Sequence, residues 1–482
     1  MVDVAIVGSG PNGLAAAVVM ARAGLSVEIF EKNTTIGGGA RTLELTLPGF
    51  KHDVGAAIHP MGLGSPFFRA FELTKRVEFA IPEVSYVHPL DGSAAAVAFK
   101  DLGRTASELG RDGVAWRNLF SPLVEHIDGL TDFALSQLLR FPRDPMTAVR
   151  FGLRVLEQGS PAWNLRFRSP AASALLSGVS AHSIGRMPTL AVAGAGLVLA
   201  AHAHARGWPV AVGGSQAIVD AMAADVVDHG GLIHTAVEIE DVRQLTRSAV
   251  AMFDVSARSL AHIASAVLPD RYARDLLRFK YGNGVAKVDF ALASPVPWSN
   301  AHAHETATLH LGGTRRQIAH SESEVARGIV PSNPYVLVAQ PSLFDRSRAP
   351  HGQHTLWAYM HVPAGSNFDP VEAITNQIER SAPGFRDVIL AAEGMTAQDI
   401  QSFDPNFVGG DISSGALTIG QMLKRPVLSP VPWRTPAKGV YLASSSTPPG
   451  TGVHGLSGYY AARSALRREF GIGAVPDLSA NR

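Results

Sequence analysis

A glycine-rich turn near the N-terminus has the residue types and the spacing that bind a nucleotide diphosphate. Gly8, Gly10 and Gly13 lie between a β-branched run at residues 2–7 and a small-residue run at residues 14–23. The first glycine permits a tight turn, the second lets a diphosphate approach the backbone, and the third lets a helix pack against a sheet. Free N–H groups at the start of that helix would face the ligand, and the turn also contains Pro11 and Asn12.

Two further groups extend this site along a long ligand. Glu31 ends a second expected strand at the distance typical of a carboxylate that binds ribose hydroxyls, and Lys32 follows it. A second glycine-rich loop at residues 36–41 contains Gly38, Gly39 and Arg41. Its backbone amides and guanidinium suit an extended diphosphate ligand, which favours FAD over NAD. The alternative is an ordinary glycine turn with a surface arginine.

These groups need a parallel sheet to position them. The order strand, turn, helix, strand is the βαβ unit of a doubly wound sheet, whose right-handed crossover brings the turn to the carboxyl edge. Residues 66–206 lack this alternation of strands and helices and are expected to be mostly helical, with helices at 115–139 and 146–158. Later strands are expected at residues 232–237, 249–254, 286–292, 335–340, 355–363 and 439–443.

The predicted fold class is α/β, with two domains interleaved in sequence. A Rossmann-like, doubly wound FAD-binding domain is expected to comprise residues 1–65, 207–260 and 433–482. A mixed-sheet plus helical substrate or cap domain is expected to comprise residues 66–206 and 261–432.

Composition excludes several functions. Of the 482 residues, 42 are Lys or Arg and 41 are Asp or Glu, so a net charge of +1 provides no field that would attract nucleic acid. The chain has no cysteine, which excludes disulfides, thiolate metal sites and cysteine nucleophiles. The N-terminus has no targeting pattern, so a cytoplasmic location is the expectation. The longest apolar run of the chain, at residues 190–201, is too short to span a bilayer.

Three separated blocks resemble the phytoene desaturase-like family of FAD-dependent oxidoreductases, and more distantly the flavin amine oxidases. They are IGGGARTLELTLPGFKHDVGAAIHP (36–60), DPNFVGGDISSGA (404–416) and WRTPAKGVYLASSSTPPGTGVHGLSGYYAA (433–462). The resemblance implies a noncovalent, extended FAD, with Val237 contacting adenine through its backbone. It places the flavin end beside a C-terminal loop that contains Ser446, Gly450, Gly452, Val453 and His454. A helix start there would stabilise the negative charge of reduced flavin.

The same resemblance points to two side chains for proton transfer. Lys287, on an expected strand, matches the lysine that holds a water beside the flavin in amine oxidases, and its alternative is a strand lysine that points to solvent. His59 lies in the segment that passes the ring in this family, where it would donate to the flavin, act as a general acid, or simply pack beneath the cofactor. His454 also fits a capping role at the start of a helix.

Other candidate sites find little support. The pairs His202/His204 and His302/His304 suggest a metal, but no third ligand cluster accompanies them, so no metal is expected. No nucleophile elbow of the hydrolase type occurs between a strand and a helix. Residues 190–201 are read as a buried helix, with the wall of a hydrophobic tunnel or peripheral contact with a membrane surface as alternatives.

The sequence therefore predicts an FAD-dependent oxidoreductase of the dehydrogenase or desaturase type. FAD would take a hydride equivalent from a small hydrophobic substrate, of polyene or isoprenoid kind, and pass electrons to a quinone or O2. One alternative is an oxidase similar to the flavin amine oxidases. Another is a protein without redox activity, an isomerase or an interaction protein that FAD stabilises.

Overall fold

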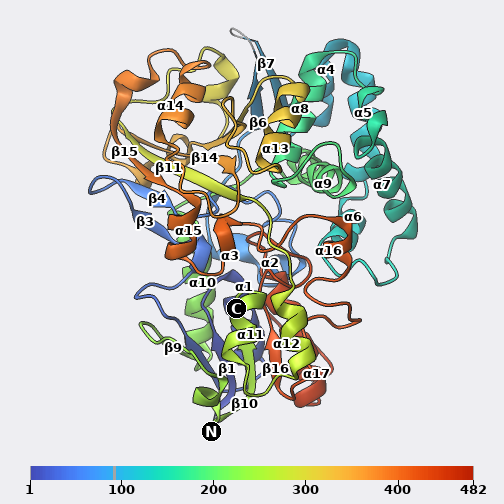
Figure 1. Cartoon of the computed structure of the whole chain (residues 1–482), viewed down its shortest axis with the longest axis vertical. Coiled ribbons are helices and arrows are strands. Elements are labelled where there is room, and N and C mark those ends of the chain that lie inside the picture. The colour runs from blue at the N-terminus through green and yellow to red at the C-terminus, as the bar shows by residue number, and fades with distance from the viewer. Residues whose placement is uncertain (1, 91–93, 481–482) are drawn as a thin grey trace.

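A five-stranded parallel sheet forms one end of the molecule. The computed structural model describes residues 2–90 and 94–480. The sheet order is β16 (Val440–Leu442), β10 (Ser248–Phe253), β1 (Val2–Val7), β2 (Val27–Phe30) and β9 (Leu232–His234). Figure 1 shows this sheet at the lower end, close to the N-terminus. The α/β architecture with a Rossmann-like sheet is confirmed, and its strands come from three separated stretches of the chain.

Three helices cover this sheet and hold the glycine turn in place. They are α1 (Pro11–Arg22), α10 (Gln216–Asp228) and α17 (Leu456–Glu469). Small residues let α1 and α17 approach closely: a methyl group at Gly458 would lie 1.7 Å from the Asn12 carbonyl oxygen. The C-terminal helix is thereby fixed against the helix that follows the glycine turn.

A seven-stranded mixed sheet forms the second layer system, at the upper left of Figure 1. Its order is β15 (Ile389–Met395), β11 (Gly284–Leu292), β14 (His354–Val362), β13 (Val336–Ala339), β12 (Thr308–Leu311), β6 (Val84–Pro89) and β7 (Ala95–Phe99). All pairs are antiparallel except β12 with β6. The expectation that residues 66–206 are mostly helical is wrong for β6 and β7, which form the edge of this sheet.

Helices cover the β6–β7 edge and make a layer of their own, at the upper right of Figure 1. They are α4 (Leu102–Glu108), α5 (Gly113–Val124), α6 (Ile127–Ala134), α7 (Pro145–Gln158), α8 (Pro170–Ala181) and α9 (Leu190–Arg206). The helix expected at 115–139 is divided in two at His126, whose φ of −115° and ψ of 37° are not helical. Helix α9, which contains the apolar run, is buried along most of its length. No helix among the described residues is long and apolar enough to cross a membrane.

Shorter elements connect these layers. The short strands are β3 (Thr42–Glu44), β4 (Lys51–Asp53), β5 (Phe79–Ala80) and β8 (Val210–Ala211). The remaining α-helices are α2 (Pro66–Ala70), α3 (Leu73–Arg76), α11 (Ala257–Ile263), α12 (Asp270–Leu277), α13 (Arg315–Val325), α14 (Val371–Glu379), α15 (Ala397–Phe403) and α16 (Ile419–Leu423). Strand β9 ends earlier than expected because Ala236 adopts a φ of 57°, which a strand does not permit.

Candidate active site

One large cavity joins the parallel sheet to the helical layer. Its volume is about 730 Å³, and its wall is mostly apolar. At one end it is lined by the glycine turn and by the ends of β2 and β10. In the middle it is lined by residues 54–61 and by the C-terminal loop, and at the far end by α7 and α9. The predicted site residues that line it are Gly8, Gly10, Pro11, Asn12, Glu31, Lys32, Gly38, Gly39, His59, Val237, Lys287, Ser446, Gly450, Gly452 and Val453.

Side chains at the three glycines of the turn would collide with neighbouring atoms of the protein. Gly8 has a φ of 94°, in the left-handed region, and a methyl group there would lie 2.7 Å from the Asp254 carbonyl oxygen. A methyl group at Gly10 would lie 2.6 Å from Oδ2 of Asp254. Gly13 does not line the cavity, since its place is against the Gly8 carbonyl, where helix meets sheet. Each glycine therefore has a steric reason to lack a side chain.

Asp254, at the end of β10, is a site residue that sequence reasoning did not single out. Its Oδ2 accepts the Gly13 amide over 2.8 Å, so the carboxyl lies across the start of α1 and lines the cavity. Burial raises the pKa of Asp254 to about 7, while the Gly13 bond opposes this and the charges of Asp404 and Glu31 add to it. The sequence feature that could have indicated it is an acid at the end of the strand predicted at residues 249–254.

Glu31 is held in a fixed orientation at the carboxyl end of β2. Its Oε2 accepts the amide and the hydroxyl of Ser9 over 3.1 and 2.7 Å, and its Oε1 accepts the amide and side chain of Asn33. The Glu31 carbonyl accepts the amide of Val237, so the free backbone group that Val237 offers the cavity is its carbonyl. Lys32 is exposed and pairs with Glu238 over 3.1 Å.

Arg41 lies behind the second glycine loop. Its Nε donates to the Gly38 carbonyl over 2.9 Å, and its guanidinium stacks on Phe403 at 4.2 Å. Its Nη2 is buried and has no hydrogen-bond partner. Burial lowers the pKa of Arg41, although Asp404 and Glu31 oppose this. A buried, unsatisfied guanidinium N–H is costly, so this atom is suited to an anionic ligand.

The C-terminal loop brings backbone to the middle of the cavity. Gly450, Gly452 and Val453 line it immediately before α17 begins. Ser446 also faces the cavity, and its hydroxyl accepts the Ala257 amide over 3.1 Å. His454 does not line the cavity: its Nδ1 accepts the Leu456 amide over 3.1 Å at the start of α17. This is the geometry of the capping alternative.

Lys287 is buried, and its ammonium group faces three oxygens of the protein. Nζ donates to the Asp53 carbonyl over 2.9 Å and to the Val54 carbonyl over 2.8 Å, and it forms an ion pair with Asp289 Oδ2 at 2.9 Å. Burial lowers the pKa of Lys287 and raises that of Asp289 to about 6. The solvent-facing alternative is excluded, because Lys287 is 3% exposed.

A network of buried charges continues from Lys287 beneath the cavity. Arg348 pairs with Asp53 over 2.9 Å and with Asp345 over 2.7 Å, and all three side chains are fully buried. Asp53 also accepts the Thr42 hydroxyl and the Ser215 amide. The network joins strands β4 and β11, the loop after β13 and the start of α10. It fixes residues 54–59, which line the cavity, in position.

His59 lies on this segment, and its hydrogen bonds determine its tautomer. Nε2 lies 3.0 Å from the Ser215 hydroxyl, which donates its only proton to the Ala56 carbonyl. Nε2 must therefore carry the hydrogen, and Nδ1, which has no partner, is left as an acceptor. Burial lowers the pKa of His59 to about 4. The ring is thus neutral near pH 7, and it is a weak base because burial disfavours its protonated form.

The far end of the cavity is apolar with two aromatic side chains. Trp357 and Tyr359 lie two residues apart on β14 and so share one face of the strand. Their ring centroids are 5.2 Å apart with planes at 88°, and both side chains line the cavity. His182 lines it too, and its Nε2 lies 2.7 Å from that of His310. Burial lowers the pKa of His182 to about 3, so this pair is neutral. The end is shaped for an uncharged, largely hydrophobic molecule.

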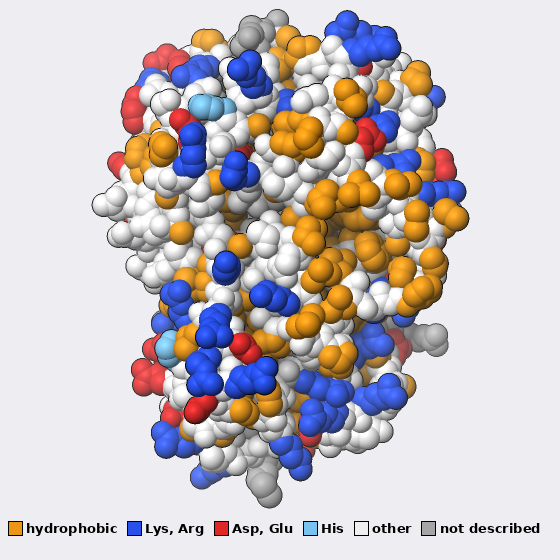
Figure 2. Space-filling model, turned by 45° about the vertical axis from the view of Figure 1, so that its right-hand side comes forward, with side chains coloured by type: hydrophobic (Ala, Val, Ile, Leu, Met, Phe, Trp, Pro, Cys, Tyr) orange, Lys and Arg blue, Asp and Glu red, His pale blue; other side chains and the backbone are white. Residues whose placement is uncertain are grey.

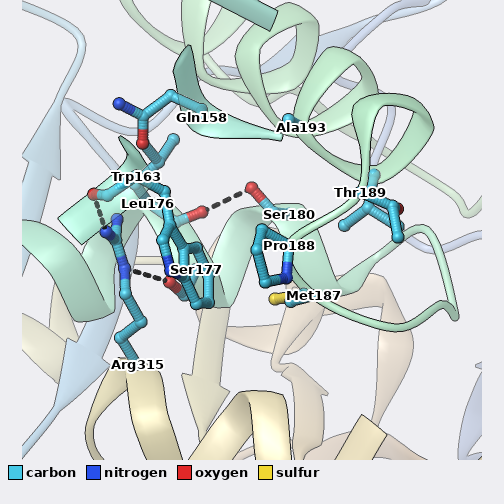
Figure 3. A pocket seen from close by; sticks show the side chains of 11 residues that line it. Gln158, Trp163, Leu176, Ser177, Ser180, Met187, Pro188, Thr189, Ala193 and Arg315 are labelled. Carbon is cyan, nitrogen blue, oxygen red and sulfur yellow. Dashed lines mark hydrogen bonds between the residues drawn. The ribbon is translucent and has the colours of Figure 1, made fainter. Parts of the chain in front are cut away.

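A separate small hollow lies between α8 and α9 (Figure 3). Arg315 lies at its edge, donating to the Trp163 carbonyl and, over 3.0 Å, to the Ser177 hydroxyl. The hollow has a volume of about 10 Å³ and holds no more than one water molecule.

Among the described residues no group of three or more acidic or histidine side chains has metal-ligating geometry. His202 and His204, both on α9, bond separately to Thr131 and to the Phe99 carbonyl.

Comparisons with known proteins agree with this geometry. Residues 6–72 match the model of the NAD(P)-binding Rossmann-like domain. The chain is 25% identical to the rat pyridine nucleotide-disulfide oxidoreductase domain-containing protein 2 over 544 aligned residues, which cover 96% of this chain and 93% of the relative. The protein thus has a Rossmann-like domain of the NAD(P)-binding kind at its N-terminal end.

Solved structures support the same fold across the whole chain. An oxidoreductase from Methanosarcina mazei has a TM-score of 0.63 at 16% identity and covers 97% of this chain and 100% of its own. The cyclohexylamine oxidase from Brevibacterium oxydans has a TM-score of 0.55 at 15% identity, with 98% of both chains covered. A 4,4'-diapolycopen-4-al dehydrogenase from Metabacillus indicus is 31% identical, but over only 26% of this chain. The similarity to this dehydrogenase is thus local, whereas the similarity to the rat protein and the shared fold extend over nearly the full length.

Proposed function

We propose that the cavity binds one noncovalent FAD and that the protein is an FAD-dependent dehydrogenase acting on a hydrophobic substrate. The observation that carries this proposal is one continuous cavity, polar at the glycine turn and apolar at the helical layer. Its polar end is lined by Gly8, Gly10 and Glu31, and Arg41, which does not itself line the cavity, has an unsatisfied Nη2 behind the Gly38 loop. These groups match a diphosphate and a ribose.

The lining of the cavity favours FAD over NAD. Besides the glycine turn it includes Gly450, Gly452 and Val453 of the C-terminal loop, and helix α17 begins shortly after them. A helix start there is suited to the electron-rich end of an isoalloxazine ring. Bound FAD would supply the hydride acceptor, and the chain would position substrate and exclude water. The chain itself has no cysteine, so chemistry of a redox-active disulfide does not apply to it.

His59 lines the cavity as a neutral ring. Because burial lowers its pKa to about 4, it is a weak base, and in this proposal it shapes the cavity wall and does not take the proton released when a substrate C–H bond is oxidised. Lys287 has the role of fixing residues 53 and 54, whose carbonyls it binds, and through them the cavity wall. In this proposal Lys287 is a positioning residue.

A second candidate function is oxidation of an amine. The perpendicular rings of Trp357 and Tyr359 at the apolar end would stack against a neutral amine and stabilise its cationic form. The similarity to cyclohexylamine oxidase supports this candidate at the level of the fold. Against it, the cavity wall near these rings has no free carboxylate that would attract an ammonium group.

An anaerobic titration separates the candidates. The purified protein, loaded with FAD, is mixed with a polyene, with a saturated isoprenoid or with cyclohexylamine, and the flavin band near ~450 nm is followed. Bleaching by an isoprenoid but not by the amine supports the proposed function. Bleaching by the amine alone supports the second candidate. A protein that binds FAD but that no donor reduces, while dithionite bleaches it, has a role without redox activity.

A further inference from the structure

Helix α7 is apolar over more of its circumference than the protein covers. Four of its residues line the cavity: Ala148, Phe151, Gly152 and Val155. Four others point to solvent with exposed fractions of 55 to 61%: Met146, Val149, Leu153 and Leu156. At about 100° per residue these two sets occupy neighbouring arcs of one helix. The apolar lining of the cavity therefore continues onto the outside of the molecule.

Apolar side chains from other segments extend this surface. Leu139 and Phe141 precede α7 and are 49% and 83% exposed. On α16, Ile419 is 41% exposed and also lines the cavity, and Leu423 is 38% exposed; Leu428, after this helix, is 73% exposed. Figure 2 shows hydrophobic side chains gathered around a hollow on this side of the molecule. We name it the α7–α16 face, after the two helices. So large an exposed apolar surface marks an interaction site.

The charged side chains on this face include, in the described part of the chain, three cations and one anion without a strong partner; the anion is Asp144, at the start of α7, whose Oδ2 lies 4.0 Å from Nδ1 of His126. Arg150 on α7 and Lys424 after α16 have no ion-pair partner among the described residues. Arg143 is 78% exposed and lies 3.7 Å from Asp132, which Arg140 already neutralises. The nearby carboxylate of Glu157 is likewise neutralised, by Arg166 over 2.5 Å. The α7–α16 face therefore combines apolar side chains with unneutralised positive charge.

This combination favours a lipid surface over a second copy of the chain. A symmetric dimer through this face would bring the same patch of each copy together, and with it the unpaired cations of both. An anionic bilayer offers acyl chains to the apolar side chains and phosphates to the cations. The hollow in the face would then open towards the acyl region, where a hydrophobic substrate is dissolved.

We propose that the α7–α16 face docks on an anionic phospholipid bilayer and that the cavity takes its substrate directly from that bilayer. The docking depends only on the α7–α16 face, whereas the uptake of substrate from the bilayer also rests on the proposed function. Sedimentation with phosphatidylcholine vesicles, with and without phosphatidylglycerol, tests the docking. We expect the full chain to sediment with the anionic vesicles, and sedimentation to fall as salt is raised.

Two double variants make the test specific. Val149→Ser with Leu153→Ser removes apolar area from α7 at side chains that do not line the cavity. We expect it to weaken vesicle binding about tenfold or more. The matched control is Val227→Ser with Leu232→Ser, at side chains 55% exposed on the far domain. It should bind as the unmodified protein does. Thermal melts of both variants show whether either has lost its fold.

A fluorescence measurement reports where α7 lies. Leu156→Trp places an indole on the exposed stripe, and phosphatidylcholine brominated in its acyl chains quenches indoles that reach them. We expect the quenching of this variant to exceed that of the unmodified protein. The docking is wrong if the protein binds neither kind of vesicle, or if the control loses binding as strongly. It is also wrong if the protein is a dimer that the α7 double variant dissociates.

Failure of the docking and failure of the proposed function give different results. Vesicle binding through α7 needs no flavin chemistry, so it persists if no donor bleaches the flavin. Conversely, a protein that an isoprenoid reduces in detergent but that ignores vesicles keeps the proposed function and loses the docking. If vesicles bind but reduction is no faster from a bilayer than from detergent, the clause on substrate access is wrong.

Discussion

The amide of Gly13 donates to Oδ2 of Asp254 over 2.8 Å, which joins the third glycine of the turn to the end of β10. The same oxygen lies where a side chain on Gly10 would otherwise be. An ionisable group thus lies against the surface proposed to receive a diphosphate. Because its pKa is about 7, its charge state depends on pH within the physiological range.

We predict that Asp254→Asn stabilises the protein without FAD above pH 7. The folded-state pKa is raised from an ordinary 3.8, so Asp254 contributes stability below pH 3.8 that is lost as the pH rises through about 7. The variant keeps an acceptor for the Gly13 amide and has no charge to bury. The gain in unfolding free energy at pH 8 should be on the order of 3 kcal/mol. Urea titrations at pH 5 and pH 8 measure it, and an equal gain at both would contradict the assignment.

FAD binding should be coupled to proton uptake by the same carboxyl. A bound diphosphate next to Asp254 raises its pKa further, so above pH 7 binding takes up a proton. Calorimetric titrations in buffers of different ionisation enthalpy measure the number of protons taken up when FAD binds. We expect uptake at pH 8 in the unmodified protein and a reduced uptake in Asp254→Asn. Identical uptake in both would assign the proton to another group.

Lys287 and Asp289 form a buried pair whose disruption should be costly. Lys287→Met leaves Asp289 without its cation, and we expect a loss of about 3–5 kcal/mol in unfolding free energy. Lys287→Met combined with Asp289→Asn removes the buried charge as well and should lose less. Urea denaturation of the unmodified protein, both single variants and the double variant gives the coupling. Additive losses would show that the two side chains act independently.

His59 should make the protein less stable in acid. Its folded-state pKa of about 4 lies below the ordinary 6.5, so its contribution is complete above pH 6.5 and is lost as the pH falls towards 4. The loss from this group is on the order of 3 kcal/mol at pH 4. His59→Asn should flatten the dependence of stability on pH in this range. His320→Asn, at a side chain 68% exposed, is the control and should leave the slope unchanged.

Arg41 should contribute strongly to FAD affinity. Arg41→Met removes the buried, unsatisfied Nη2, and we expect FAD to bind about 10- to 100-fold more weakly. Fluorescence titration of the protein without FAD measures this. Arg41→Lys should recover part of the affinity, because it restores charge but not the planar donors. Unchanged affinity in Arg41→Met would place the diphosphate elsewhere.

The local part of the site could be predicted from the sequence, because its signals are contiguous. Gly8 to Gly13 and the strands beside them are read from spacing, since turn, helix start and sheet edge follow one another along the chain. Strand β10 was expected within one residue of its start and end. The buried network could not be predicted, because Asp53 and Arg348 are 295 residues apart and meet only through tertiary packing.

One error has an identifiable cause. Strands β6 and β7 are short and lie between helical segments, so the pairing of β6 with β12, more than 200 residues later, outweighs the local pattern. Lys287 was correctly placed on a strand, but its partners are backbone carbonyls of residues 53 and 54, which no residue type reveals. Side-chain identity indicates which groups can react, and tertiary packing decides which of their atoms are free.

Titration of the protein, stripped of any bound cofactor, with FAD tests the central claim most directly. Calorimetry with FAD, with NAD and with FMN as ligands measures the stoichiometry and the affinity of each. We predict one FAD per chain, released intact on denaturation, with NAD and FMN binding far more weakly because neither reaches both ends of the cavity. A folded protein that binds no FAD, or that prefers NAD, would contradict the account.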